Sequence, residues 1–404
     1  MLVRFSVQNF GSIKDKQTLS FEAEKSKHLE DYYVIETNGL RLLKLGLIFG
    51  ANASGKTTIL KALEFLRTLV YEPAIIKSKV FEFEPFKFDE KTPLQNTFFE
   101  IEFIQNDTRY LYHVELNKNA IVSEELYSYN PKKYNVFIRT TDLGNQATKI
   151  NFGNKTKINE NTKNIFEQVT LWNNTVLGGF LKFNLVSKEL KDAIDWFASL
   201  QKPITSDYCI KVFFESETNI TELEKHTIVD MLRKADFNIS NFYFRDTTTL
   251  DIDFEHTVNN KKYFLDYNLQ SIGTQRYYTF VNLLLLLIKN SVFVSIDELE
   301  SSLHPDLFIH FLLSFLTNSK KSQIIATTHN REILNNKDIF RNDAIWITDK
   351  GNANCATELY SLADFDTKVI RDTTNIYNAY KFGKLGGVPH LSDYYIDIEN
   401  DEKK

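Results

Sequence analysis

The sequence contains very little cysteine. Only Cys209 and Cys355 occur in 404 residues, they lie far apart, and neither stands in a CxxC or Cys/His cluster. This usage excludes a disulfide framework as the basis of the fold and argues against a structural zinc site.

Long hydrophobic runs and a strong net charge are also missing. The most apolar run, 281–288, contains Asn282 and is followed by Lys289. It falls well short of the roughly 20 residues that cross a bilayer, so it predicts a buried helix. Residues 1–15 lack the apolar stretch of a secretory signal. The formal charge of −5 gives no overall basic field for nucleic acid or membrane, although a sum can conceal a local basic groove. We expect a cytoplasmic protein without a membrane partner.

Apolar residues make up 43% of the chain, enough for a large core, and their spacing changes along it. Alternation predicts paired strands around Gly11, a buried strand over 42–49 and an antiparallel meander from about 80 to 130. Residues 140–165 are poor in apolar side chains and predict a mobile loop. Helical spacing follows over 165–200 and 220–235.

From residue 274 the pattern alternates between helix and strand, which is typical of the second half of a mostly parallel sheet. The expected helices are 274–290, 305–318 and 331–335, and the expected strands are 291–296, 322–327 and 344–348. The sequence thus predicts an α/β fold with a mixed sheet, an antiparallel β subdomain and a helical insertion. The expected parts are a first half (1–140), a mainly helical insertion (141–240), a second half (241–390) and an acidic tail (391–404). Internal repeats and heptads long enough for a coiled coil are absent.

Residues Gly50 to Thr57 form the pattern G-x-x-x-x-G-K-[ST] between an apolar strand and a helical segment. The glycines let the backbone curl so that N–H groups point at phosphate oxygens, and the helix N-terminus adds partial positive charge. Lys56 is expected to reach the β- and γ-phosphates, and the Thr57 hydroxyl is expected to ligate Mg²⁺. The residues expected to bind ATP are Gly50, Ala51, Asn52, Ala53, Ser54, Gly55, Lys56, Thr57 and Thr58.

Two carboxylates end the apolar strand 291–296. Asp297 and Glu298 stand at its C-terminal end, where α/β sheets bind ligands. Alone, they would be an ordinary acidic turn. Paired with the phosphate loop, Asp297 is expected to hold Mg²⁺ and Glu298 to act as the general base on the attacking water. Glu300 is a rival for the role of base.

Two further segments fit a nucleotide site. His329 directly follows an apolar strand, and its near-neutral pKa lets it donate a hydrogen bond to a γ-phosphate. Ser271 and Gly273 precede the long apolar helix, whose first turn presents N–H groups to an anion. By themselves, Ser271 would be a plain helix cap and His329 an ordinary surface or core histidine.

In this order the motifs resemble those of ABC-type ATPases, and more closely their SMC-, RecF- and OLD-like branch. GANASGKT is similar to the Walker A motif, VFVSIDE to Walker B, QSIGTQR to the signature segment and ATTHN to the switch-histidine strand. ELESSLHP, with Ser302 and His304, lies where the family has its D-loop. GANASGKTTILKAL, SIDELESSLHP, ATELYSLADF and FGKLGGVP are most similar to the RloA-like ATPases of bacterial abortive-infection and restriction-linked loci.

The resemblance implies a P-loop NTPase of the ABC-ATPase head type that works as a homodimer or higher homo-oligomer. Ser271 and Gly273 of one subunit would close over ATP and Mg²⁺ held by another, with Glu298 and His329 catalytic. The chain departs from the family in two places: Gln95 is the only candidate for the Gln loop, and His304 stands where Asp is usual. OLD-type nucleases carry a C-terminal Toprim domain, but only residues 330–404 follow His329 and they lack its acidic cluster, so a nuclease in the same chain is not expected.

Three functions remain. The first is the ATPase of an anti-phage system that senses infection and controls a separate effector protein, such as a nuclease. The second is a RecF-like DNA-repair ATPase that clamps duplex DNA, which keeps DNA as a candidate partner. The third is an ATP-bound scaffold without hydrolysis, against which the intact Glu298 argues.

Overall fold

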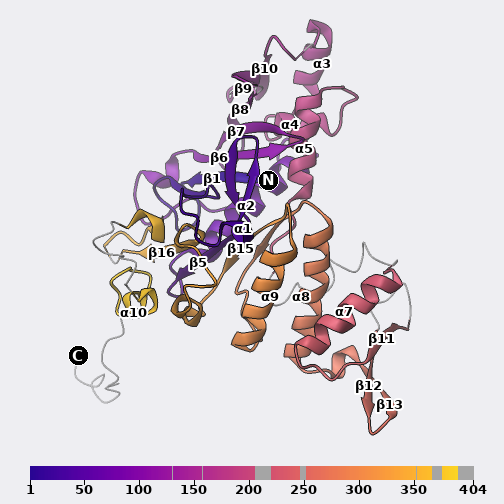
Figure 1. Ribbon diagram of the computed structural model, residues 1–404. Helices are drawn as coiled ribbons and strands as arrows, with labels where there is room; N and C mark the ends of the chain where they lie inside the picture. The colour runs from indigo at the N-terminus through magenta and orange to yellow at the C-terminus, as the bar shows by residue number, and fades with distance from the viewer. Residues whose placement is uncertain are drawn as a thin grey trace, which may run out of the picture.

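Figure 1 shows the computed structural model of the chain. It describes residues 1–129, 131–156, 158–204, 220–245, 252–351, 353–365 and 375–389. Cys209 and the predicted acidic tail lie outside these ranges. The described residues form two large sheets and two small ones, and the large sheets share one hydrophobic core.

The largest sheet has seven antiparallel strands in the order β10-β9-β8-β7-β6-β1-β2, which confirms the predicted N-terminal pair and meander. The turn between β6 and β7 consists of Asn106 and Asp107, with φ of 47° and 55°. Asn and Asp tolerate this left-handed conformation, which suits a two-residue hairpin. The strands are β1 (Leu2–Gln8), β2 (Gln17–Ser20), β6 (Thr97–Gln105), β7 (Thr108–Leu116), β8 (Ile121–Tyr129), β9 (Lys133–Asp142) and β10 (Ala147–Phe152).

The mobile loop predicted over 140–165 is wrong. Strand β9 continues to Asp142, β10 pairs with it along its whole length, and helix α3 begins at Glu160. Only Ile150 is buried within β10. This edge strand is held mainly by backbone hydrogen bonds to its neighbour β9, and such bonds do not require apolar side chains. Apolar content therefore could not reveal it.

The second large sheet has five strands in the order β14-β15-β5-β16-β17. The first four are parallel and β17 is antiparallel to β16. All six residues of β5 are buried, as expected of a central strand covered on both faces. The strands are β5 (Leu45–Gly50), β14 (Phe293–Ile296), β15 (Gln323–Thr327), β16 (Ile345–Lys350) and β17 (Thr357–Ser361). The carboxyl ends of β5, β14 and β15 consequently lie at one edge of the sheet.

The single strand predicted over 42–49 is two strands. Leu40–Leu43 forms β4, which pairs with β3 (Val34–Thr37), and β5 begins at Leu45. The chain changes sheets at the buried Lys44, whose ammonium donates to the carbonyl of Leu316 at 2.8 Å. A polar residue with a specific acceptor thus interrupts an otherwise apolar run.

The predicted alternation in the last third of the chain is confirmed, except that 331–335 is a 3-10 helix. Helices α8 and α9 lie side by side (Figure 1), and the rings of Phe280 and Phe311 stack between them with centroids 4.8 Å apart. The helices are α1 (Glu30–Tyr33), α2 (Lys56–Tyr71), α3 (Glu160–Val169), α4 (Val176–Phe180), α5 (Lys188–Ser199), α7 (Glu222–Lys234), α8 (Ile272–Lys289), α9 (Pro305–Asn318) and α10 (Ile376–Lys381). The 3-10 segments are η1 (Thr92–Leu94), η2 (Tyr267–Leu269), η3 (Arg331–Asn335), η4 (Asn342–Ala344) and η5 (Leu362–Asp364). None of the helices in the described ranges is long and apolar enough to span a membrane.

A separate small core lies at the N-terminal end of α8. There α7 and the sheet β11 (Asn241–Phe244), β12 (Ile252–Val258) and β13 (Lys261–Asp266) pack on the buried aromatic face of α8. In Figure 1 this unit lies at the end of α8 that points away from the seven-stranded sheet. The predicted α/β class with a mixed sheet, an antiparallel β subdomain and inserted helices is confirmed. The domain boundaries at 140 and 240 stay predictions.

Candidate functional site

The loop from Gly50 to Thr57 joins the end of β5 to the start of α2, as the sequence predicts. Ala53 and Gly55 have positive φ values of 62° and 107°. A Cβ built on Gly55 would lie 2.1 Å from the Thr357 hydroxyl oxygen, so only glycine fits there. The loop therefore curls tightly in front of the N-terminus of α2, where unpaired N–H groups favour an anion.

Lys56, the first residue of α2, turns back over the loop. Its side chain is buried, and its ammonium donates to the carbonyls of Gly50 at 2.9 Å and Ala51 at 3.0 Å. Burial lowers the pKa of Lys56, and nearby carboxylates, Asp297 foremost, oppose that shift. A cation placed over a curled backbone is suited to a polyphosphate.

Three hydroxyl residues from distant strands and turns support the loop. The hydroxyls of Ser54 and Thr348 lie 2.7 Å apart. Thr357 donates to the carbonyl of Ser54 at 2.9 Å, and its hydroxyl lies 2.7 Å from that of Ser12. Ser12 in turn donates to Thr58 at 3.1 Å. The loop is thus fixed to β16, to β17 and to the turn after β1.

The segment 382–389, with sequence FGKLGGVP, packs against the same loop. A Cβ built on Gly387 would lie 3.5 Å from the Cα of Gly50. Tyr380 donates to the carbonyl of Gly387 at 2.9 Å, and its ring meets that of Phe49 edge-on at 6.0 Å. The same Cβ would lie 2.6 Å from Cγ2 of Ile347, so the absence of a side chain at Gly387 permits the C-terminal segment to pack closely on β16, beside the end of β5.

Thr57 and Asp297 meet, although they are 240 residues apart. The Thr57 hydroxyl lies 3.0 and 3.2 Å from the two carboxylate oxygens of Asp297. A hydroxyl and a carboxylate beside a phosphate-binding loop fit Mg²⁺, which in nucleotide sites takes its other oxygen ligands from the substrate and water. Within the described ranges, no group of three or more His, Cys, Asp or Glu side chains gathers to hold a metal without such help.

The two candidate bases have different surroundings. Glu298 is exposed, has a φ of 51°, and donates its backbone N–H to the Thr327 hydroxyl at 2.8 Å. No hydrogen bond to its carboxylate is found in the described part of the chain. One oxygen of Glu300 accepts from the backbone N–H of His329, and the other is buried without a hydrogen-bond partner. Glu298 is therefore the carboxylate that water can approach.

His329 shares this site with Lys56. Its side chain remains accessible, yet the groups packed around it lower its pKa below the usual 6.5, and the charge of Lys56 lowers it further. The carboxylates of Glu300, Glu298 and Asp297 oppose this shift. A neutral imidazole at pH 7 retains one N–H for donation to a phosphate oxygen.

Ser271 lies outside this cluster in its own chain. Its hydroxyl accepts from the backbone N–H of Thr274 at 3.1 Å and caps α8. Figure 1 places this end of α8 beside β11–β13, away from β5 and α2. Ser271 is exposed between two apolar side chains, Leu269 and Ile272, each 70% exposed. An accessible polar group flanked by accessible apolar ones is suited to a protein contact.

The predicted signature and D-loop segments touch each other. A Cβ built on Gly273 would lie 3.3 Å from the carbonyl oxygen of Ser302, which has a φ of 60°. His304 caps α9, because its Nδ1 accepts from the backbone N–H of Asp306 at 3.3 Å. The predicted signature and D-loop segments therefore belong to one surface.

Gln95, the Gln-loop candidate, follows η1 and is exposed. Its backbone carbonyl accepts from the Asn9 side chain at 2.9 Å. In the described ranges, no hydrogen bond joins its side chain to the loop of residues 50–57.

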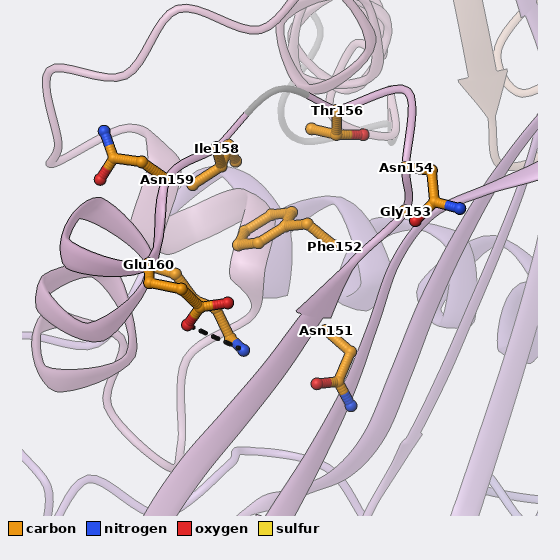
Figure 2. A pocket seen from close by; sticks show the side chains of 9 residues that line it. Asn151, Phe152, Gly153, Asn154, Thr156, Ile158, Asn159 and Glu160 are labelled. Atoms are coloured by element: carbon orange, nitrogen blue, oxygen red, sulfur yellow. Dashed lines mark ion pairs between the residues drawn. The ribbon is translucent and has the colours of Figure 1, made fainter.

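Two of the cavities in the described part of the chain lie along α2 and between β10 and α3. A groove of about 720 Å³ runs along α2 from Thr58 to Glu72, with Phe65 and Phe81 in its walls. A second cavity, of about 540 Å³, lies between β10 and α3 (Figure 2). Amide side chains line the second cavity, and its Lys163 is paired with Glu160 at 3.6 Å.

A family model described as "AAA domain, putative AbiEii toxin, Type IV TA system" matches residues 47–156 and 181–335. No curated protein matches the sequence. Solved structures similar to the chain include the SMC head domain from Thermotoga maritima, at 15% identity and a TM-score of 0.43, covering 89% of this chain and 98% of that one.

Two further similar structures contain a second protein. One is an SMC head bound to the C-terminal winged-helix domain of ScpA, at 14% identity and a TM-score of 0.46, covering 89% and 97% of the two chains. The other is an SMC head with an extended coiled coil bound to the C-terminal domain of ScpA, from Pyrococcus furiosus. It has 12% sequence identity and a TM-score of 0.45, and the match covers 89% of this chain and 96% of that one. At these scores the similarities add no argument to the fold seen in the chain itself.

Proposed function

The chain belongs to the AAA domain family whose model it matches, and on that premise we propose that it binds and hydrolyses ATP. One observation carries the proposal. The Thr57 hydroxyl, at the start of α2, lies 3.0 Å from the carboxylate of Asp297, which directly follows β14, and Asp297 is the foremost carboxylate that raises the pKa of Lys56, so a phosphate-binding loop and a carboxylate suited to a metal converge at one edge of the sheet. The combination is the one that positions a nucleoside triphosphate for phosphoryl transfer to water.

In this proposal the loop residues Gly50 to Thr58 and the ammonium of Lys56 hold the phosphates. Thr57 and Asp297 hold Mg²⁺, which supplies neutralising charge to the phosphate oxygens when bound. Glu298 accepts the proton of the attacking water. His329, neutral at pH 7, donates to the γ-phosphate.

We further propose that the complete site forms between two subunits. The support is the position of Ser271 and Gly273, which are exposed or partly exposed, lie next to Ser302, and do not bond to the phosphate loop of their own chain. The N-terminus of α8 would donate to the γ-phosphate across the interface, and Leu269 and Ile272 would become buried.

For the cellular role we propose a sensor or regulator in a bacterial anti-phage system, acting in the cytoplasm on a separate effector protein, within the RloA-like group. The description of the family names a toxin of a toxin–antitoxin system, which is compatible with a role in abortive infection. A RecF-like role is the alternative that the experiments below separate.

The biochemical proposal is tested by measuring phosphate release from ATP by the purified chain, with Mg²⁺ and with a chelator. Turnover that requires Mg²⁺ supports it, and the absence of ATP binding by calorimetry would refute it. Duplex DNA added at two salt concentrations gives a second measurement. Stimulation that falls steeply with salt supports the RecF-like role, because phosphate contacts release counterions.

The cellular proposal needs the chain together with its neighbouring genes. Expressed in a bacterium, the intact set should reduce phage plaque formation, and the same set carrying Lys56→Ala should not. Equal plaque numbers for both sets would contradict the defence role.

A further inference from the structure

We infer that Thr327, the last residue of β15, is a positioning residue for both acids of the site. The inference rests on the proposed ATPase function and deepens it. In this assignment Thr327 orients the carboxylate of Asp297 for the metal ion and fixes the turn that carries Glu298. The sequence placed it only within the switch-histidine segment ATTHN and gave it no role of its own.

Three hydrogen bonds join Thr327 to three consecutive residues after β14. Its hydroxyl donates to Oδ1 of Asp297 at 2.5 Å and accepts from the backbone N–H of Glu298 at 2.8 Å. Its backbone carbonyl accepts from the N–H of Leu299 at 3.0 Å. A hydroxyl has one proton to donate and two lone pairs that accept. The Thr327 hydroxyl donates its proton to Asp297, and one of its lone pairs accepts the N–H of Glu298.

The contact fixes the Asp297 carboxylate from one side. Oδ1 receives both Thr327 and Thr57, whereas Oδ2 receives only Thr57 among the hydrogen bonds described. The carboxylate is therefore held by two hydroxyls, that of Thr57 in the phosphate loop and that of Thr327 on β15. Groups that hold a metal-binding carboxylate in this way typically change metal affinity or activity by roughly 10–100-fold when removed.

The contact also stabilises the backbone of the candidate base. Glu298 has a φ of 51°, a conformation that side-chain-bearing residues seldom adopt. The Thr327 hydroxyl accepts its N–H, and the Thr327 carbonyl accepts the next one. Without the hydroxyl, the N–H of Glu298 loses its acceptor and the turn is free to relax, which redirects the carboxylate.

Thr327 is buried inside the sheet, so its hydroxyl bonds to protein groups and not to water. The residue is fully buried and lies on β15, which pairs in parallel with both β14 and β5. Two residues later, the N–H of His329 donates to Glu300. The segments 297–300 and 327–329 are thus tied together at both ends, so a displacement of one moves the other.

The test compares Thr327→Val, which keeps the shape and removes the hydroxyl, with Thr327→Ser, which keeps the hydroxyl. Thr279→Val is the matched control, because Thr279 is also buried and donates only to the carbonyl of Gln275 in its own helix. Three quantities are measured: ATP affinity in chelator, Mn²⁺ affinity of the complex with a nonhydrolysable ATP analogue by electron paramagnetic resonance, and kcat as a function of Mg²⁺ concentration.

For Thr327→Val we expect Mn²⁺ affinity and kcat to fall by roughly 10–100-fold, with metal-free ATP affinity within about twofold of wild type. Thr327→Ser should stay within about threefold in all three, and Thr279→Val should match wild type. Unchanged Mn²⁺ affinity and kcat in Thr327→Val would overturn the inference, and so would an equal loss of metal-free ATP binding, which indicates general disruption. A wild-type chain that binds no ATP would instead refute the proposed function.

Discussion

The hydroxyl of Thr357 donates to the carbonyl of Ser54 at 2.9 Å across 303 residues of sequence. A strand near the end of the chain thereby forms one wall of a loop near its beginning. The fit is close enough that the neighbouring Gly55 has no space for a methyl group. This relationship gives the first prediction.

Gly55→Ala should abolish ATP binding. The new Cβ would meet Thr357 within 2.9 Å at three atoms, and a φ of 107° is strained for alanine. Gly39→Ala is the control, since Gly39 also has a positive φ but nothing within 4 Å of a built Cβ. Calorimetry should show lost binding in the first variant and wild-type binding in the second, with a stability cost of about 1 kcal/mol from strain. Equal ATP affinities in Gly55→Ala and Gly39→Ala would mean that the phosphate loop can accommodate a methyl group at position 55.

Lys56→Ala should weaken ATP binding by roughly 10–100-fold or more, because the phosphates lose a charge-assisted hydrogen bond of about 1.5–3 kcal/mol. Lys188→Ala removes an exposed lysine at the start of α5 and is the control for net charge. Calorimetry with ATP measures both. Wild-type affinity in Lys56→Ala would contradict the assignment of the phosphate loop.

Glu298→Gln should reduce ATP hydrolysis by about 100-fold or more while ATP still binds, because the amide keeps the shape but cannot accept the proton. Glu90→Gln, at an exposed surface position, should behave as wild type. Steady-state phosphate release and calorimetry give the two quantities. Turnover within a few-fold of wild type would move the role of base to Glu300.

Mixing two inactive variants tests the two-subunit site. Lys56→Ala lacks the phosphate contact and Ser271→Arg blocks the capped end of α8, so each alone should be inactive. Random exchange puts about half of the dimers in mixed form with one intact site of two, which gives roughly a quarter of wild-type turnover if the sites are independent. ATP should also shift Glu298→Gln toward dimer on a sizing column. An inactive mixture after verified exchange, with no shift, would show that the site is complete within one chain.

The pKa of His329 should depend on the positive charge of Lys56. The pKa lies below 6.5 through burial and then through the charge of Lys56, so Lys56→Ala should raise it. His310 is an internal control, because burial and Lys234 lower its pKa. Titration of carbon-13-labelled histidines by NMR should show His329 moving and His310 unchanged. Since both groups titrate below 6.5 when folded, the stability they contribute is present above pH 6.5 and is lost as the pH falls through their folded pKa values. If the pKa of His329 is the same in the wild type and in Lys56→Ala, then His329 does not share a site with Lys56.

The local parts of this site could be predicted from the sequence, because their chemistry demands fixed spacing. The loop of Gly50 to Thr57 and the pair Asp297–Glu298 each lie within a few residues, and strand and helix patterns gave their context. That Thr57 and Asp297 would meet followed from parallel strands ending at one edge of a sheet.

The supporting residues could not be predicted in the same way. Ser12, Thr327, Thr348 and Thr357 are common hydroxyl residues on strands or turns, and no spacing marks them, because their partners come from other strands. Gly387 was noticed only within a resembling segment, and its contact with Gly50 depends on three-dimensional packing. The edge strand β10 was missed because its stability comes from backbone pairing, which composition does not record.

The attachment of the C-terminal segment to the phosphate loop has a consequence for synthesis on the ribosome. The loop emerges within the first sixty residues, but Thr348, Thr357 and Gly387 follow about 300 residues later. At roughly 5–20 residues per second, the nascent chain carries an unsupported loop for about 15–60 seconds. Contacts of such long sequence separation form late in folding. A chain interrupted before residue 345 would contain the whole phosphate-binding motif but would lack Thr348, Thr357 and Gly387, which pack against it. We therefore expect ATP binding to depend on residues 345–389, which reach the phosphate loop last.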